Sequence, residues 1–211
     1  MTVAVSGTGN MGAGITRLLA AKGEQVVIGS RDPAKAAKLA EGIGAGAEGG
    51  GIAAAAKSAD VVIFAVNYPQ AGKAVRDAGG FAGKVLVDIS NPITGDFKDL
   101  RVGRTTSAAE ELQKLAPEAK VVKAFNTIFA QLLPTEAREG RGPVQVFVAG
   151  DDEAAKRAGS DLVARGGFQP IETGPLRNAR FLEPRGEINI HFGFFQGWGT
   201  SAAPAWIKAA A

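Results

Sequence analysis

The chain has 211 residues, of which 45% are hydrophobic and 21% charged, and its formal net charge at pH 7 is +3. This length is sufficient for one α/β domain with a full core, and the small net charge, spread along the chain, argues against a nucleic-acid partner. The absence of cysteine and the presence of one histidine, His191, exclude disulfides, thiolate chemistry and multi-histidine metal sites.

The chain begins with an apolar strand, Val3–Ser6, that runs into a glycine-rich turn and then into a helix pattern over 15–23. The spacing Gly7-x-Gly9-x-x-Gly12 is typical of dinucleotide-binding sites. The first glycine permits the tight turn, the second lets the backbone approach a pyrophosphate, and the third lets the helix pack close to the strand. The helix N-terminus would offer unpaired N–H groups to the phosphates. The residues predicted to bind there are Gly7, Thr8, Gly9, Asn10, Met11 and Gly12; the alternative is a glycine turn with no ligand.

The remaining apolar runs alternate with helix patterns at the spacing of βαβ units. Strands are predicted over 25–30, 60–66, 84–89, 120–125, 144–150 and 169–172, and helices over 34–41, 52–57, 68–79, 107–115 and 152–165. Residues 42–51 form a glycine-rich stretch that we expect to be a flexible surface connection, and 96–106 a polar loop. The phenylalanine-rich segment from Leu176 to about Trp198 is expected to form one or two buried helices.

This order predicts a doubly wound, mostly parallel α/β sheet of the Rossmann type. We expect residues 1–175 to form the nucleotide-binding domain and residues 176–211 a small C-terminal helical extension, the two making one structural unit. The longest apolar run, Val61 to Val66, is far shorter than the roughly 20 residues of a membrane span. Because the first strand starts at residue 2 or 3, no signal peptide is expected, and a cytoplasmic protein without a membrane partner is the default.

The end of the second predicted strand indicates which dinucleotide binds. NAD-binding proteins usually place Asp or Glu there to hold the ribose 2′-hydroxyl, whereas this chain has Gly29-Ser30-Arg31. A hydroxyl beside a guanidinium suits a 2′-phosphate, so we predict NADP(H) as the cofactor, bound by Ser30 and Arg31, with Lys35 adding charge. In the alternative, Arg31 is a solvated surface charge and Asp32 holds the ribose, but Asp32-Pro33 fits better as the N-cap and first residue of a helix.

Asparagine residues follow three of the predicted strands. The carboxyl ends of the strands line the ligand crevice in such sheets, and asparagine supplies both a donor and an acceptor for ribose hydroxyls or the nicotinamide carboxamide. A turn-forming role is the alternative for each of them. The strand-end residues predicted to contact the cofactor are Val66, Asn67, Asn91, Pro92 and Asn126.

No acid–base machinery is predicted. The sequence has no nucleophile elbow and no pair of carboxylates with a reason to lie close together. His191 lies in an aromatic run and is expected to be packed in the core or an interface, and Asp151-Asp152 reads as the capped start of a helix. We therefore predict no catalytic residue, and hydride transfer between two bound redox groups fits a site with so few reactive side chains.

Several segments together resemble one family. They are Gly7-Thr8-Gly9-Asn10-Met11-Gly12, Ile28-Gly29-Ser30-Arg31, Ser90-Asn91-Pro92-Ile93, Lys123-Ala124-Phe125-Asn126-Thr127 and Gly174-Pro175-Leu176. The chain is similar in these to the NADPH-dependent deazaflavin reductases, whose coenzyme is 8-hydroxy-5-deazaflavin, and its nucleotide domain resembles the cytosolic part of membrane ferric reductases, which handle a flavin.

The resemblance implies a homodimer, NADPH held by Thr8, Asn10, Met11, Ser30 and Arg31, and a deazaflavin or flavin co-substrate in a cleft closed by the C-terminal segment. In that segment, the run 183–191 is more polar than the family's helix and is interrupted by Pro184 and Gly186.

Two other functions stay open. One is an NADPH-dependent reductase of a small carbonyl or imine, which needs a proton donor, and Tyr68, the single tyrosine, has no adjacent lysine. The other is a non-catalytic NADP(H) sensor.

Overall fold

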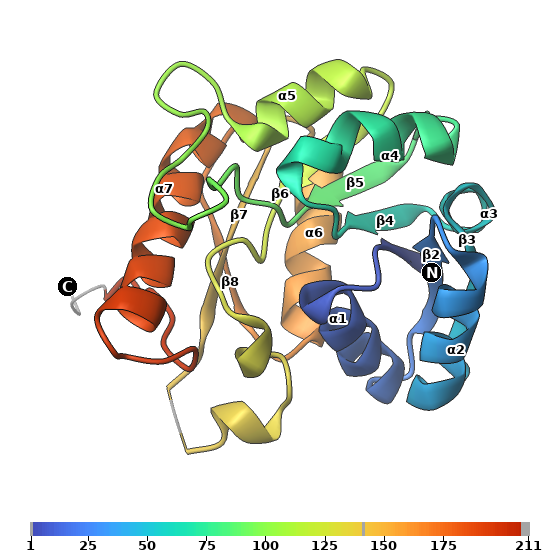
Figure 1. Ribbon diagram of the computed structural model, residues 1–211, viewed down its shortest axis with the longest axis horizontal. Helices are drawn as coiled ribbons and strands as arrows, with labels where there is room; N and C mark the ends of the chain where they lie inside the picture. The colour runs from blue at the N-terminus through green and yellow to red at the C-terminus, as the bar shows by residue number, and fades with distance from the viewer. Residues whose placement is uncertain (1, 141, 208–211) are drawn as a thin grey trace.

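An eight-stranded sheet runs through the middle of the molecule in the computed structural model, which describes residues 2–140 and 142–207 (Figure 1). Its strand order is β3-β2-β1-β4-β5-β6-β7-β8. The strands are β1 (Thr2–Ser6), β2 (Gln25–Ser30), β3 (Glu48–Gly51), β4 (Val61–Phe64), β5 (Val85–Asp88), β6 (Lys120–Lys123), β7 (Gln145–Gly150) and β8 (Gln169–Glu172). All neighbours pair in parallel except β6 and β7, which are antiparallel. The predicted fold class is therefore confirmed.

The chain reverses its direction of travel across the sheet at β1, which pairs with β2 on one side and β4 on the other. The carboxyl ends of β1 and β4 thus flank a topological switch point, where ligands bind in open sheets of this kind. The glycine loop that follows β1 lies at this point, as the sequence predicted.

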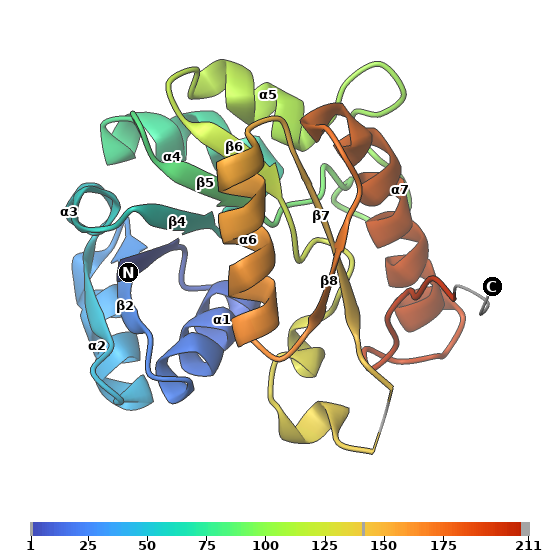
Figure 2. The same ribbon diagram turned by 180° about the vertical axis from the view of Figure 1, so that it is seen from behind.

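Helices cover both faces of the sheet because the side chains of each strand alternate between them. Val3 and Val5 belong to the core under α1 (Asn10–Ala21) and α6 (Glu153–Arg165), whereas Ala4 belongs to the core under α3 (Ile52–Ser58), α4 (Ala71–Ala78) and α5 (Ala108–Leu115). Helix α2 (Pro33–Ile43) covers β2 near one edge, and α7 (Ala179–Ile190) lies beside β7 near the other. In Figure 2, which shows the molecule from behind, α6 lies in front of the sheet.

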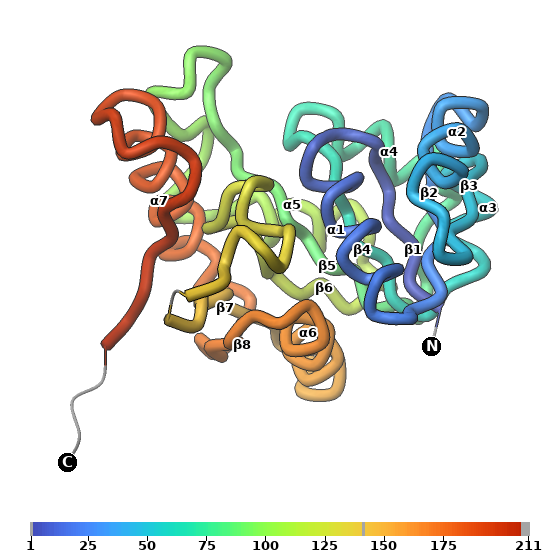
Figure 3. The backbone as a smooth tube through the Cα atoms, turned by 90° about the horizontal axis from the view of Figure 1, so that it is seen from below, coloured from blue at the N-terminus to red at the C-terminus, as the bar shows by residue number. Residues whose placement is uncertain are grey.

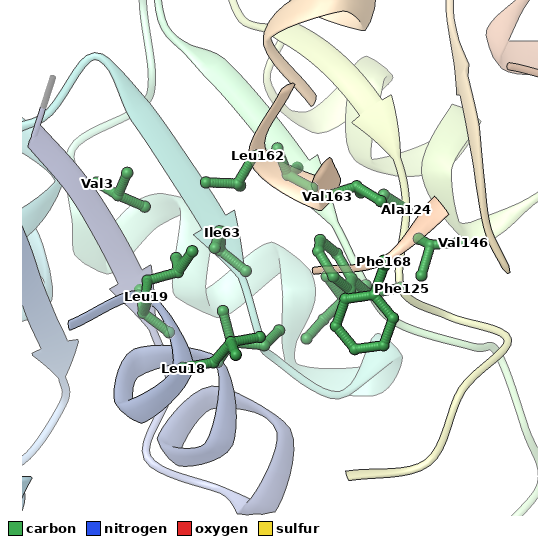
Figure 4. Packing of buried hydrophobic residues seen from close by; sticks show 14 of the residues in the cluster. Val3, Leu18, Leu19, Ile63, Ala124, Phe125, Val146, Leu162, Val163 and Phe168 are labelled. Atoms are coloured by element: carbon green, nitrogen blue, oxygen red, sulfur yellow. The ribbon is translucent and has the colours of Figure 1, made fainter. Parts of the chain in front are cut away.

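The core beneath α1 and α6 also anchors the end of β6. Leu18, Leu19, Leu162 and Val163 point into this core, and the rings of Phe125 and Phe168 meet edge to face with centroids 6.0 Å apart (Figure 4). Phe125 is 2% exposed and has a φ of +58°, a conformation that is costly outside glycine and that this packing holds in place. The backbone is turned there just before Asn126.

The helix caps predicted at Asp32 and Asp152 are confirmed. Asp32 precedes α2, and its carboxylate accepts the Lys35 N–H at 3.1 Å. Ser107 caps α5 by accepting the Glu110 N–H at 3.1 Å, and Asp152 caps α6 by accepting the Ala155 N–H at 2.8 Å. The Asp32 and Asp152 carboxylates are thereby occupied with backbone donors.

The prediction that all of 42–51 is a flexible connection was wrong for its second half. Residues 48–51 form β3, which pairs in parallel with β2 from Val27↔Glu48 to Ser30↔Gly51. A Cβ at Gly49 would clash with the carbonyl oxygen of Ala36, so only glycine lets this strand pass so close to α2. Backbone pairing needs no apolar side chains, which is why the apolar pattern did not reveal it.

The prediction of buried helices after residue 176 was right about helix and wrong about burial. Helix α7 continues through Pro184 and Gly186 and is followed by a π-helical turn, η5 (His191–Phe195). It packs against the rest of the molecule through polar and small residues, including Glu183, Gly186 and Asn189, which are buried. Several large apolar side chains of α7 and η5 nevertheless face outward: Phe181, Ile188, Phe194 and Phe195 are exposed.

The expectation for His191 was likewise wrong as regards the core. Its side chain is one-third exposed, lies 3.4 Å from the Glu187 carboxylate and has its ring 5.1 Å from that of Phe195.

Leu182 of α7 packs with Phe147 and Ala149 of β7, so the predicted C-terminal extension rests directly on the sheet. The last residues of that extension, 208–211, lie outside the described residues. Among the described helices, none has the length and apolar character required to cross a membrane.

Candidate cofactor site

The loop after β1 is shaped by the glycines of the motif. Gly7 has a φ of +129°, and a Cβ there would clash with the carbonyl oxygen of Ala65 next to it on the β4 side. A Cβ at Gly12 would clash with the carbonyl oxygen of Gly7, so glycine allows α1 to start directly against the loop. At Gly9 an added Cβ would meet nothing within 4 Å in the described part of the chain, so the open side of the loop is free for a ligand.

Helix α1 begins at this loop without a side-chain cap. Gly9 is its N-cap residue, and within the described residues no side chain accepts its first N–H groups and no acidic residue stands in its first turn. Uncapped N–H groups and the positive end of the helix dipole favour an anion. The loop and helix therefore fit a pyrophosphate, in agreement with the dinucleotide that the glycine motif predicts.

A cleft of about 360 Å³ extends from the glycine loop to the end of β2. Ser30, Arg31 and Lys35 line it, and Arg31 and Lys35 are exposed. The Asp32 carboxylate is bound to the Lys35 N–H, and the Asp32 N–H donates to the Ser30 hydroxyl at 3.2 Å. Because Asp32 is engaged as a cap, this end of the cleft presents cations and a hydroxyl, the groups that suit a 2′-phosphate.

A second cleft of about 380 Å³ continues from the first along the carboxyl ends of β4 and β5. The two clefts share Ala65, Val66, Asn67 and Gln70, so they form one groove across the switch point. The further lining residues of the second cleft include Met11, Tyr68, Ile89, Ser90, Asn91, Phe97 and Arg101. The structure thus brings most of the predicted residues to one groove: Gly7, Thr8, Gly9, Met11, Ser30, Arg31, Lys35, Val66, Asn67 and Asn91.

The other four predicted residues lie elsewhere. Asn10 lines a third groove along α1 that shares Thr8 and Gly9 with the first cleft, whereas Gly12 and Pro92 are buried. Asn126 is 5% exposed, and its Nδ2 donates to Asn91 Oδ1 and to the Leu182 carbonyl, both at 2.9 Å. In return Asn91 Nδ2 donates to the Asn126 carbonyl at 2.7 Å, so Asn126 stands behind Asn91 and orients its side chain.

Sequence reasoning missed a buried ionic cluster beside this groove. The ammonium of Lys123, at the end of β6, lies 2.7 Å from the Asp88 carboxylate and 2.8 Å from that of Glu183 on α7. All three side chains are at most 1% exposed. A charged residue at the end of an apolar strand was the available signal, because a buried lysine requires carboxylate partners. We will call Lys123, Asp88 and Glu183 the Lys123 cluster.

The protonation of the Lys123 cluster follows from its contacts. Burial lowers the pKa of Lys123, but Asp88 and Glu183 outweigh that effect, so its pKa is raised and the ammonium stays charged. Burial raises the pKa of Glu183, whereas its oxygens accept hydrogen bonds from three donors, Lys123 and the N–H groups of Ala108 and Ala109. Because these contacts are all donors, we assign Glu183 as a carboxylate.

Tyr68 lines the second cleft, but its phenolic proton is directed away from a ligand. The hydroxyl donates to Glu111 Oε2 at 2.6 Å. Burial and then Glu111 raise the pKa of Tyr68 to about 12. The phenol therefore stays neutral with its proton on Glu111's side, which gives no support to a proton-donating tyrosine of the kind that carbonyl or imine reduction uses.

The sheet order, the glycine loop at the switch point and the cationic end of the groove define a Rossmann-type protein that binds a dinucleotide. Residues 2–92 match the family model described as "NADP oxidoreductase coenzyme F420-dependent". The chain is 35% identical over 207 residues to the F420-dependent NADP reductase of Methanothermobacter marburgensis, covering 87% of this chain and 88% of that protein. It therefore belongs to the family of F420-dependent NADP oxidoreductases.

A solved structure supports this family, and other proteins share part of the sequence or the fold. A crystal structure of a candidate F420-dependent NADP reductase from Arthrobacter sp. FB24 superposes with a TM-score of 0.84 at 31% identity, covering 94% of this chain and 96% of that one. The chain is also 34% identical over 181 residues to rat metalloreductase STEAP3, covering 86% of this chain but 35% of that protein's length. A reductive aminase from Aspergillus terreus, at 17% identity and a TM-score of 0.69, shares the fold.

Proposed function

We propose that this protein is an NADPH-dependent oxidoreductase that transfers a hydride between the nicotinamide and a deazaflavin, coenzyme F420 or a close analogue. The observation that carries the proposal is the continuous groove, cationic at one end and partly aromatic at the other, in a chain that matches F420-dependent NADP reductases over nearly their whole length.

We propose the following division of the groove. Ser30, Arg31 and Lys35 hold the 2′-phosphate, and the α1 N-terminus with Thr8 and Gly9 holds the pyrophosphate. Val66, Asn67 and Asn91, farther along the groove, hold the ribose and the nicotinamide. Asn10, Gly12, Pro92 and Asn126 support these residues from behind or beside the groove.

The acceptor occupies the far end of the second cleft in this proposal. Phe97, which is 45% exposed there, supplies an aromatic surface for a flat ring, and Arg101 supplies a cation. Bound NADPH supplies the hydride, and the protein's task is to hold donor and acceptor in register and to limit water between them. No ionisable side chain of this chain is required to exchange a proton with the nicotinamide.

The direct test mixes the protein with NADPH and oxidised coenzyme F420 and follows the loss of deazaflavin absorbance. We expect turnover with NADPH, much slower turnover with NADH, and slow or no turnover when FMN or FAD replaces the deazaflavin. If NADPH binds tightly and none of the three acceptors is reduced, the proposal is refuted, and a carbonyl or imine reductase or a non-catalytic NADP(H) sensor takes its place.

We also propose that the protein is a cytoplasmic homodimer in which residues 176–211 supply the subunit contact and close the acceptor cleft beside Phe97. No described residue of this segment lines the second cleft itself, but the ring of Phe194 lies 6.1 Å from that of Phe97. The exposed aromatic residues Phe181, Phe194, Phe195 and Trp198 support the subunit contact, since such side chains are usually covered. They belong to the end of the chain that lies across the molecule from α2 (Figure 3). Light scattering after size exclusion should give twice the 21.6 kDa chain mass; a monomer would contradict this part.

A further inference from the structure

The Lys123 cluster controls the backbone of one residue in the wall of the second cleft. The Lys123 ammonium donates to the carbonyl oxygen of Ser90 at 2.5 Å, and the Ser90 N–H donates to Asp88 Oδ1 at 2.9 Å. Both backbone polar groups of Ser90 are therefore held by members of the cluster. Ser90 and its neighbour Asn91 line the cleft, so the cluster directly contacts a residue of the cleft wall without lining the cleft itself.

Helix α7 also packs against the segment formed by Ser90 and Asn91. Gly186 packs against Asn91 so closely that an added Cβ would lie 2.6 Å from Asn91 Nδ2. Asn126 holds the Asn91 carboxamide by the reciprocal hydrogen bonds described above, and the left-handed Phe125 sets the direction in which Asn126 leaves β6. The segment thus has little freedom as long as β6 and α7 stay in place.

Glu183 extends the cluster to the start of α5. Its carboxylate accepts the N–H groups of Ala108 at 2.9 Å and Ala109 at 3.2 Å, the first residues of α5. One buried ammonium therefore connects β5, β6, α5 and α7. Buried ion clusters are a poor way to gain stability compared with apolar packing of similar volume, but they do fix geometry when all their partners are satisfied.

We propose that Lys123 is a positioning residue for the hydride transfer: with Asp88 and Glu183 it fixes Ser90 and Asn91 so that they can hold the nicotinamide half of NADPH. The inference rests on the proposed function, since it assumes that NADPH lies along the groove with its nicotinamide at the second cleft. Lys123 does not touch the ligand. It acts through the Ser90 backbone.

The test separates the two halves of the cofactor. Adenosine 2′,5′-bisphosphate carries only the 2′-phosphate half and should occupy the first cleft, whereas NADPH reaches both clefts. Binding of each is measured by calorimetry for the wild type, for Lys123→Met, and for Lys120→Met, a control on the same strand whose exposed side chain pairs with Asp152 at the surface. We expect Lys123→Met to weaken NADPH binding at least fivefold and bisphosphate binding less than twofold, and Lys120→Met to change neither.

A second variant keeps the test decisive if Lys123→Met fails to fold, because removing the ammonium leaves two buried carboxylates unpaired. Glu183→Gln preserves the side-chain volume and should weaken NADPH threefold or more, again without affecting the bisphosphate. With deazaflavin as acceptor, both variants should lower kcat more than they raise the KM for NADPH. Equal losses for both ligands, or no loss for either, would overturn the inference. A wild-type protein that binds the bisphosphate no better than 5′-AMP would instead refute the proposed NADP site.

Discussion

Replacing Arg31 by alanine tests the assignment of the 2′-phosphate site. Arg31 is exposed on the wall of the first cleft, and within residues 2–140 and 142–207 no hydrogen bond or ion pair engages its guanidinium. A hydrogen bond to a charged group contributes about 1.5–3 kcal/mol. Because the guanidinium remains partly solvated, we take the lower figure, about 1.5 kcal/mol, which corresponds to roughly a tenfold change in Kd. Lys35 lies in the same cleft and should preserve part of the preference for NADPH.

The assay is a titration of Arg31→Ala with NADPH and with NADH, followed by nicotinamide fluorescence. We expect the Kd for NADPH to rise about tenfold and that for NADH to stay within about twofold. Lys38→Ala is the matched control, since Lys38 is an exposed cation on α2, the helix that follows Arg31, and does not line the cleft. If Arg31→Ala weakened both cofactors equally, or if Lys38→Ala had the same effect, the reading of Arg31 as the 2′-phosphate ligand would be wrong.

Gly9 and Gly12, the second and third glycines of the motif, should respond differently to an added methyl group. Gly12→Ala places a Cβ against the Gly7 carbonyl and should lower the free energy of unfolding in urea by about 1–3 kcal/mol. Gly9→Ala projects into open space, so it should leave unfolding unchanged and weaken NADPH binding; similar unfolding curves for both would contradict the packing argument. Tyr68→Phe should keep turnover within about threefold, whereas a loss of about 10² or more would identify Tyr68 as a proton donor. Arg180→Met tests pH dependence. The hydrogen bond from Arg180 holds the pKa of Glu110 below its usual range, so this pair stabilises the fold above the ordinary carboxyl pKa and loses its effect as the pH falls through the lowered value. The variant's urea midpoint should be lower than the wild type's at pH 7, and the gap should close below about pH 4; a gap independent of pH would contradict this.

The site residues divide by the range of the interactions that form them. The position of the glycine loop and of the cationic residues after β2 in one cleft was predictable, because it depends on spacing within a few residues of one strand–turn–helix unit. The Lys123 cluster was not, because Lys123 and Glu183 are 60 residues apart and meet only when α7 packs beside β6 and β7. Asn126 shows the same limit, since the sequence placed it at the correct edge of the sheet but not behind Asn91.

By itself, the sequence determined the α/β class, the parallel order of the βα units and the presence of a dinucleotide loop, because apolar periodicity and glycine spacing are local properties of the chain. Tertiary structure decided the rest. Strand β3 exists because its backbone could pair with β2, and Phe181 and Ile188 of α7 face outward because the helix packs through Glu183, Gly186 and Asn189. In both cases the outcome depended on which partner a segment found across the fold, and a one-dimensional pattern does not contain that information.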